Sequence, residues 1–355
     1  MSKTVVITGS QSYIGSRLVP YLKERGIRVR EYDAGFFRDC TLYPSQEATI
    51  FKDVRELTEQ DLAGAETLVH LAGISNDPFG SLSAEAVYDP TRAYTARLAT
   101  LCRAMGIRFI FASSCSVYGI GGEALVTEES PTFPQTPYSL NKLQIEQDLT
   151  AMSDGTFAPI ILRFATVFGL SPRMRFDLVV NMCVGMALTN QKIILNSDGK
   201  AWRPLVHIED ACEAIRRCLN MPLPPRGPLR LNIGDTGQSH RILEVAEMIQ
   251  RQVPGCELEF LPQGRQRSDD GLELVRDRKI QDGVDRRTYR VACERVKEAL
   301  PGFACAWPVA RGIERLIGEL RALGLTQTQL QDIRFYRVQY LESLLKAGSP
   351  VATLT

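Results

Sequence analysis

Two side chains four residues apart, Tyr138 and Lys142, could together move a proton. The prolines before them, Pro134 and Pro137, suit the start of a helix, and this spacing places both side chains on one helix face. A free phenol has a pKa of about 10 and is a poor base at neutral pH, but a neighbouring ammonium favours the phenolate. The pair is a candidate acid/base, with an ordinary surface pair as the alternative.

Hydroxyl groups follow a strand that we expect over residues 107–113. The turn after it carries Ser113, Ser114 and Ser116, whose side chains would emerge at the carboxyl end of the strand. In an open α/β sheet that end is where ligands bind, so these hydroxyls could face a bound cofactor.

An apolar run at residues 5–7 predicts a buried strand near the N-terminus. A turn containing Gly9 and Gly15 leads from it into a helix expected over residues 14–25. The free N–H groups and positive dipole end of such a helix can bind a pyrophosphate. Ser12 replaces the middle glycine of the usual G-x-x-G-x-x-G pattern, so the turn alone leaves an ordinary tight turn open.

Asp33 closes the second expected strand, residues 27–32. A dinucleotide-binding unit places a carboxylate there to bind the adenosine ribose 2′-OH. The same charge would repel a 2′-phosphate, which favours NAD over NADP. Arg30 and Arg38 are nearby cations that leave this choice open, and a solvated aspartate before a turn is the alternative.

Composition limits the remaining possibilities. The 42 Lys and Arg residues nearly balance the 41 Asp and Glu residues, which argues against nucleic acid and membrane partners. The nine cysteines are scattered without a C-x-x-C pair, so we expect reduced core residues and no metal site. The N-terminus lacks a signal-peptide layout, and no apolar stretch approaches the roughly 20 residues that span a bilayer. A cytoplasmic protein is expected.

Alternating strands and helices predict an α/β fold with a doubly wound parallel (Rossmann) sheet and a smaller C-terminal lobe. We expect residues 1–168 to form the NAD-binding domain, to which a segment at about 203–235 returns. Residues 169–355 would mainly form the substrate-binding lobe, with a flexible substrate-facing segment at 262–290 and one amphipathic helix at 325–346. The expected strands are 4–8, 27–32, 67–71, 107–113 and 158–163, and the expected helices are 14–25, 84–105 and 138–152.

Seven motifs in order resemble the extended short-chain dehydrogenase/reductases, and among these the group of UDP-galactose 4-epimerase and the nucleotide-sugar dehydratases. The resemblance covers about residues 3–320. The motifs are TGxxxYIG at 8–15, Asp33, DV at 53–54, HLAG at 70–73, S-S-x-x-V-Y-G at 113–119, Y-x-x-x-K at 138–142 and R-x-x-x-V-F-G at 163–169.

The resemblance implies a catalytic set of Ser114, Tyr138 and Lys142, in which Ser114 would bind the reacting sugar oxygen and Lys142 the nicotinamide ribose. The implied NAD contacts are Gly9, Ser12, Tyr13, Ile14, Gly15, Asp33, Asp53, Val54, Leu71, Ala72, Gly73, Ser113, Tyr138, Lys142 and Phe164. The implied substrate contacts are Ser114, Thr166, Arg203 and Arg286, with Arg287 as the alternative to Arg286. Arg203 belongs to the segment WRPLVHIEDA at 202–211, where the family's arginine meets a sugar-nucleotide diphosphate.

Some positions depart from the family pattern. Cys115 and Ser116 stand where the dehydratases carry an Asp-Glu pair, so 4,6-dehydration is not expected, and Cys115 is interpreted as a core residue. Thr91 and Thr166 replace asparagines, which leaves the sugar open. In the segment at 202–211 we interpret His207 as structural and Asp210 as the cap of a helix at 211–220.

These residues predict an NAD-dependent epimerase that oxidises a nucleotide sugar, at C4, to a keto sugar and then returns the hydride. A reductase or dehydrogenase of a nucleotide (keto)sugar, with net redox change, is the alternative, and a non-catalytic NAD-binding protein is a third possibility. The expected partners are a nucleotide-diphosphate sugar and a second copy of the chain, paired through the helices at 84–105 and 138–152.

Overall fold

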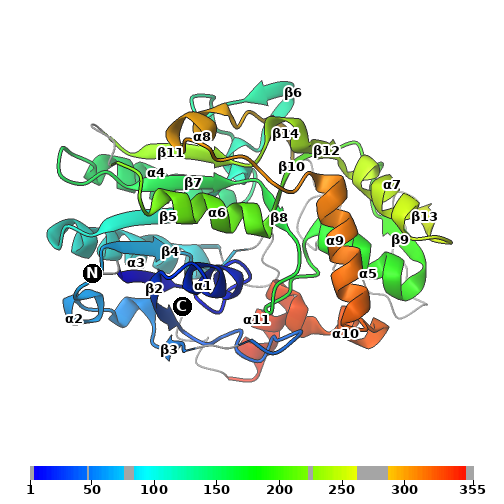
Figure 1. Ribbon diagram of the computed structural model, residues 1–355, viewed down its shortest axis with the longest axis horizontal. Coiled ribbons are helices and arrows are strands. Elements are labelled where there is room, and N and C mark those ends of the chain that lie inside the picture. The colour runs from blue at the N-terminus through cyan, green and yellow to red at the C-terminus, as the bar shows by residue number, and fades with distance from the viewer. Residues whose placement is uncertain (1–3, 46–47, 76–83, 223–226, 262–286, 349–355) are drawn as a thin grey trace.

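The computed structural model describes residues 4–45, 48–75, 84–222, 227–261 and 287–348. A seven-stranded sheet in the order β11-β7-β5-β4-β1-β2-β3 crosses the molecule (Figure 1). Its strands are β1 (Thr4–Thr8), β2 (Arg28–Asp33), β3 (Ile50–Phe51), β4 (Thr67–His70), β5 (Arg108–Ser114), β7 (Ile160–Phe164) and β11 (Leu229–Ile233). All of these pairings are parallel, and the strand order reverses between β1 and β4. The α/β, doubly wound fold class is therefore confirmed.

Helices cover both faces of this sheet, which explains why its central strands are apolar throughout rather than alternating. On one face Val5 and Ile7 of β1 share a core with Leu18 of α1. On the other face Val6 packs in a core with Leu98 of α3 and Ile145 of α4. The helices are α1 (Gly15–Lys23) and α6 (Ile208–Cys218) on the first face, α3 (Ala84–Ala104) and α4 (Pro137–Met152) on the second, and the short α2 (Glu59–Leu62).

Smaller elements from the second half of the chain gather mainly on one side of the large sheet, at the right in Figure 1. The exceptions are β11, which pairs with β7 at the edge of the large sheet, α8 (Glu294–Ala299), which packs against β11, and α6, which covers the large sheet beside α1 (Figure 1). The smaller sheets pair β8 (Thr166–Phe168), β10 (Trp202–His207) and β12 (Ser239–Arg241); β9 (Lys192–Leu195) and β13 (Glu257–Phe260); and β6 (Ile120–Val126) and β14 (Thr288–Val291). The other helices are α5 (Val179–Asn190), α7 (Ile242–Gln252) and α9 (Val309–Ala322).

The C-terminal tail differs from the single helix that its pattern predicts. It consists of α10 (Gln327–Gln331), the 3-10 turn η4 (Ile333–Phe335) and α11 (Arg337–Lys346). Asp332 ends the first helix and caps η4 by accepting the Arg334 N–H. Phe335 is 2% exposed, and its carbonyl accepts the Phe176 N–H at 3.0 Å. Tertiary packing thus breaks a segment whose local periodicity favours continuity. In the segment predicted to be flexible, residues 262–286 lie outside the described residues, and Thr288–Val291 form β14.

Candidate active site

The turn between β1 and α1 is shaped by two glycines. Gly9 has a φ of +76°, and a Cβ added to it would lie 2.6 Å from the Ala72 nitrogen. A Cβ on Gly15 would overlap the carbonyl oxygen of Gly9. Ser12, at the position of the missing glycine, accepts the Gly15 N–H through its hydroxyl at 3.0 Å. The two glycines therefore let the turn pack closely against itself and against the segment at Leu71 and Ala72, and the helix start that it forms is of the kind that can bind a pyrophosphate.

Tyr13 in this turn is buried, and its hydroxyl donates to the Gly169 carbonyl at 2.6 Å. Asn181 donates to the same hydroxyl at 3.1 Å. The Tyr13 side chain therefore joins the turn to the segment after β8, and only its backbone remains available to a phosphate. The neighbouring Ile14 is half-buried against the core.

Asp33 lies beside this turn, at the end of β2. Its carboxylate accepts the Gln11 N–H at 2.9 Å and the Gly35 N–H at 2.7 Å. Burial raises the pKa of the Asp33 carboxyl, while these two hydrogen bonds act against that rise. Both bonds fix the orientation of this carboxylate beside the turn, and its role toward a ribose stays a prediction.

Asp53 has a structural contact that the sequence does not reveal. It caps the 3-10 turn η1 (Val54–Glu56) through the Arg55 N–H and binds the Arg55 guanidinium at 2.8 Å. Val54 is 7% exposed. The Asp53 carboxylate is thus held by Arg55, and the roles of Asp53 and Val54 toward adenine stay predictions.

The segment Leu71, Ala72 and Gly73 connects the turn with the second half of the site. The Leu71 N–H donates to the Thr8 carbonyl at 3.0 Å, which holds the segment beside β1. A Cβ on Gly73 would lie 4.0 Å from the Lys142 Nζ. The Gly-bearing turn and Lys142 therefore flank the same short stretch of backbone.

Tyr138 and Lys142 occupy the first turns of α4, as their spacing predicts. Thr136 and Ser139 form a capping box at the start of this helix, with Pro137 as its first residue. The Lys142 Nζ lies 5.7 Å from the centre of the Tyr138 ring. The two side chains thus share one face and come within a short distance of each other.

Lys142 is 6% exposed, and its Nζ donates to the Ala112 carbonyl at 2.8 Å. Burial lowers the pKa of Lys142 to about 8, and the charge of Glu146 partly opposes this shift. A buried ammonium with this pKa can stabilise a phenolate near neutral pH and lose its charge above that range.

The hydroxyls at the end of β5 have different partners. The Ser114 hydroxyl accepts the Ser116 N–H at 3.1 Å and caps the 3-10 turn η2 (Cys115–Tyr118). The Ser113 hydroxyl donates to Glu146 at 2.5 Å. Ser114 pairs in register with Phe164 of β7, so the candidate catalytic hydroxyl and the candidate nicotinamide contact are neighbours. Cys115 is 1% exposed and packs in the core.

Other residues near Tyr138 were not indicated by any motif. The Tyr138 side chain packs in an apolar cluster with Tyr88 and with Leu341 of α11. Arg175 is 8% exposed, binds Asp177 at 2.9 Å and interacts electrostatically with Tyr138. No spacing rule could have linked Leu341 or Arg175 to Tyr138, because they are far apart in the sequence.

The candidate substrate residues lie in β8 and β10. Thr166 pairs with Leu205 between these strands. The Arg203 guanidinium is 8% exposed and donates to the carbonyl groups of Trp202, at 2.9 Å, and Arg287. Arg286 lies outside the described residues. The roles of Thr166, Arg203 and Arg286 stay predictions.

His207 and Asp210 have structural contacts. His207 is 2% exposed, its ring packs against Trp307 and caps α6, and burial lowers its pKa to about 4. The expectation that Asp210 caps a helix is wrong, because its carboxylate accepts the Ala306 N–H at 2.8 Å and the Trp307 N–H at 3.1 Å. Asp210 lies in the first turn of α6 and uses its acceptors to anchor the segment before α9.

Within the residues that the structure describes, no group of three or more His, Cys, Asp or Glu side chains could hold a metal ion. Over the same residues, no helix is both long and apolar enough to cross a membrane.

Comparisons with known proteins agree on one family. Residues 5–234 match the NAD dependent epimerase/dehydratase family. The UDP-glucose 4-epimerase of Bacillus subtilis (strain 168) is 25% identical over 300 residues, covering 72% of this chain and 84% of that protein. The uncharacterized UDP-glucose epimerase YtcB of the same strain is 30% identical over 244 residues, covering 61% and 73%. The solved structure of MoeE5 in complex with UDP-glucose and NAD has a TM-score of 0.71 and 25% identity, covering 90% of this chain and 99% of that one.

Proposed function

This chain belongs to the NAD dependent epimerase/dehydratase family, and on that premise we propose that it is a nucleotide-sugar epimerase acting through transient oxidation. It is an enzyme whose cofactor is NAD. One observation carries the proposal: Lys142 lies 5.7 Å from the Tyr138 ring and donates to Ala112, two residues before Ser114. An acid/base pair and a hydroxyl at the carboxyl end of β5 suit the oxidation of a sugar alcohol.

NAD would lie along the carboxyl ends of the strands, from the β1–α1 turn to α4. When bound there, it would supply a reversible acceptor for hydride. Asp33 would bind the adenosine ribose, and Lys142 the nicotinamide ribose. The remaining proposed contacts are Gly9, Ser12, Tyr13, Ile14, Gly15, Asp53, Val54, Leu71, Ala72, Gly73, Ser113, Tyr138 and Phe164.

The proton steps belong to Tyr138. As a phenolate stabilised by the Lys142 ammonium, it would remove the proton of the sugar hydroxyl, at C4, while Ser114 donates a hydrogen bond to that oxygen. After the planar keto sugar turns over, Tyr138 would return the proton to the oxygen on the other face. The cycle consumes no cofactor and changes only the configuration of one carbon.

A nucleotide-diphosphate sugar is the proposed substrate, because one relative is named UDP-glucose 4-epimerase, MoeE5 was solved in complex with UDP-glucose and NAD, and an arginine such as Arg203 suits a phosphate. Thr166 and Arg286 are the other proposed contacts. At the positions of the dehydratases' Asp-Glu pair, Cys115 is buried and Ser116 carries no carboxyl group, which argues against 4,6-dehydration.

Replacing Tyr138 by phenylalanine tests the mechanism. Turnover should fall by at least about 10²-fold, the range that positioned acid–base groups contribute, with NAD binding unchanged. The matched control is Tyr88→Phe, because the Tyr88 ring lies 6.4 Å from Tyr138 and has no proposed chemical role. A Tyr138→Phe enzyme that keeps most of its activity would refute the assignment.

Incubation with UDP-, GDP-, dTDP- and CDP-sugars in deuterated water, without added cofactor, tests the reaction type. We expect a stereoisomer of one sugar without deuterium at carbon, because the hydride returns from NAD. Deuterium uptake would indicate enolisation instead. Turnover only with added NAD or NADH, and a net change in oxidation state, would indicate the dehydrogenase or reductase alternative.

We further propose the lobe division of residues 1–168 for NAD and 169–355 mainly for the substrate, a cytoplasmic location, and a homodimer paired through α3 and α4. On α4, Leu140 is 47% exposed and available for pairing, whereas Leu149 is fully buried in the core. Light scattering should give twice the chain mass. Leu140→Asp should then shift the protein toward a monomer, and an unchanged mass would contradict this pairing surface.

A further inference from the structure

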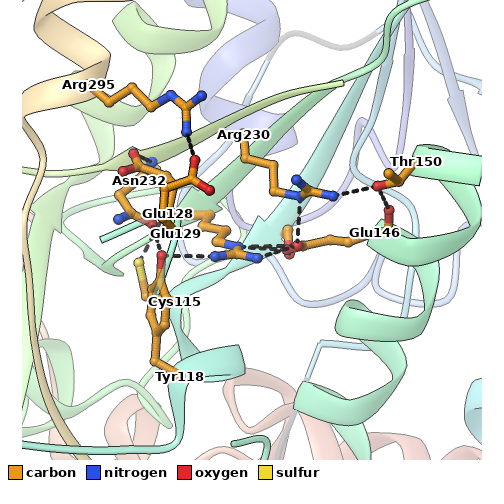
Figure 2. Close-up of polar contacts among 11 residues, drawn as sticks. Cys115, Tyr118, Glu128, Glu129, Glu146, Thr150, Arg230, Asn232 and Arg295 are labelled. Carbon is orange, nitrogen blue, oxygen red and sulfur yellow. Dashed lines mark hydrogen bonds and ion pairs between the residues drawn. The ribbon is translucent and has the colours of Figure 1, made fainter. Parts of the chain in front are cut away.

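A buried ion pair lies beside the end of β5, one helical turn along α4 from Lys142. Glu146 of α4 is 1% exposed and Arg163 of β7 is 3% exposed. The Arg163 guanidinium binds the Glu146 carboxylate through Nε at 3.0 Å and through its terminal nitrogen at 2.6 Å. Figure 2 shows Glu146 pointing from its helix into a polar cluster that also contains Tyr118 and Cys115. The mechanism proposed above uses neither member of the pair.

Glu146 contacts the same stretch of β5 as Lys142 does. Its Oε1 accepts the Ser113 hydroxyl at 2.5 Å, and Ser113 is bonded to Ser114 through the backbone. The Lys142 Nζ donates to the carbonyl of Ala112 at 2.8 Å. Two side chains one helical turn apart thus tie α4 to the end of β5, which sets how Tyr138 and Ser114 lie relative to each other.

The negative charge of Glu146 also stabilises the Lys142 ammonium. Burial lowers the pKa of Lys142 to about 8, and Glu146 acts to raise it. Two further titratable groups near Lys142, His70 and Tyr94, are uncharged at neutral pH. Burial lowers the pKa of His70 on β4 to about 3 and raises that of Tyr94 on α3 to about 12. Tyr138 shares the helix face of Lys142.

Three groups from other elements face Glu146. Arg163 is the nearest, and Arg230 of β11 lies 3.8 Å from the carboxylate. Cys115 of η2 stays a thiol, because burial raises its pKa. Burial alone would lower the pKa of Arg163, but the hydrogen bonds of Glu146 outweigh burial and raise it. Arg163 is therefore a permanent cation beside the anion that acts on Lys142.

The rest of the cluster holds Arg163 in place. Its Nη1 donates to the Tyr118 hydroxyl at 2.9 Å, and that hydroxyl donates to Asn232 of β11 at 2.7 Å. The Asn232 N–H in turn donates to Glu128 at 2.7 Å (Figure 2). A guanidinium bound on both sides cannot move away from Glu146 without leaving buried groups unpaired.

We propose that Glu146, held by Arg163, is a positioning residue that fixes the end of β5 carrying Ser114 and keeps the Lys142 ammonium charged. This inference rests on the proposed function, because it assumes that Lys142 and Tyr138 act together. The positive charge of Arg163 has the opposite effect on Lys142, because it weakens the electrostatic field of Glu146 there.

The test titrates Lys142 by NMR in the full-length, NAD-bound protein labelled with ¹³C at the lysine ε-carbon, and a Lys142→Met protein identifies its signal. Glu146→Gln keeps the acceptor for Ser113 but removes the charge, so the Lys142 titration should move down by about one pH unit. Arg163→Met should move it up. The double variant should titrate between Glu146→Gln and the wild-type protein, because it loses both the stronger effect of Glu146 and the weaker, opposing effect of Arg163.

The opposite signs separate this inference from a merely structural role. Both single variants break the same ion pair, so general loosening would move Lys142 in the same direction in each. Shifts of the same sign, or no shift in folded protein, would overturn the proposal. If Glu146→Gln is too unstable to titrate, Arg163→Met can be compared with the double variant. These two proteins differ only by Glu146→Gln, so the difference between their Lys142 titrations measures the effect of that substitution. If Arg163→Met is too unstable to titrate, the difference in Lys142 titration between Glu146→Gln and the double variant measures the effect of Arg163→Met.

A surface pair on α8, away from α3 and α4, provides the control. Lys297 binds Glu294 at 3.1 Å, with 41% and 60% of their side chains exposed. Glu294→Gln and Lys297→Met should leave the Lys142 titration unchanged, because exposed charges are screened. In turnover, the alkaline limb of the pH profile should move down in Glu146→Gln and up in Arg163→Met. The NMR titration needs no substrate, so an absence of epimerase activity would refute the proposed function without touching this result.

Discussion

Replacing Gly9 by alanine should weaken NAD binding far more than the same change at Gly26. Both residues have left-handed backbones, with φ of +76° and +73°. At Gly9 a Cβ would lie 2.6 Å from the Ala72 nitrogen and 2.8 Å from the Leu71 carbonyl carbon. At Gly26 it would meet nothing within 4 Å. The two variants therefore share the conformational cost and differ in the steric clash.

The conformational cost and the steric cost of the added Cβ can be estimated separately. A Cβ in the left-handed region costs about 1–2 kcal/mol, and this is the whole expected loss for Gly26→Ala. Gly9→Ala adds about 1–3 kcal/mol of overpacking, because backbone atoms cannot rotate away from the new methyl group. The relief of this clash must shift the turn or the segment at Leu71 and Ala72. We expect a loss of NAD affinity of at least about tenfold, which corresponds to about 1.4 kcal/mol.

Denaturant unfolding without added NAD measures the stability of both variants, and calorimetric titration measures their NAD affinity. Gly26→Ala should bind NAD like the wild-type protein. If Gly9→Ala loses no more stability than Gly26→Ala and binds NAD normally, the close approach of the turn to Ala72 does not matter for binding, and the reasoning is refuted.

Two further predictions concern the charge of Asp33 and the protonation of His70. Asp33→Asn should narrow the preference for NAD over NADP by about tenfold or more, because the carboxylate that would repel a 2′-phosphate is gone; an unchanged ratio of the two affinities would contradict this role. His70 is buried between the hydroxyls of Thr8 and Thr95, and burial together with Lys142 lowers its pKa to about 3. In the unfolded chain His70 has a pKa of about 6.5, so above that pH its ring is neutral in both states and its contribution to the free energy of unfolding is at its full value. As the pH falls, the unfolded chain binds a proton that the folded protein does not, and this contribution decreases by about 2 kcal/mol at pH 5. His70→Asn should therefore show a smaller stability loss between pH 7 and pH 5 in denaturant unfolding, and an equal loss in both proteins would count against it.

Local patterns predicted the elements that carry the site. The apolar runs before Gly9 and Ser113 became β1 and β5, and the prolines before Tyr138 mark the start of α4. These signals are local: a buried strand needs an apolar run, and a helix start needs a residue without an N–H or a capping side chain. The same logic failed at the C-terminus, where burial of Phe335 interrupts a segment with helical periodicity.

Contacts between distant residues were not predictable in this way. Glu146 continues the four-residue spacing of Tyr138 and Lys142, so its helix face could have been inferred from the sequence. Its partners could not, because Ser113 and Arg163 come from two other strands. Leu341 belongs to α11, the last helix of the described residues, and it meets the cluster around Tyr138 only through tertiary packing.

The sequence by itself determined the fold class, the family resemblance and the helix face shared by Tyr138 and Lys142, because each depends on residues close together in the chain. Only the tertiary structure decided that Asp210 binds the segment before α9, and that Lys142 is buried with Glu146 as its counter-charge. Burial and electrostatic fields arise from elements that meet in space, and their strength depends on distances that sequence spacing does not specify.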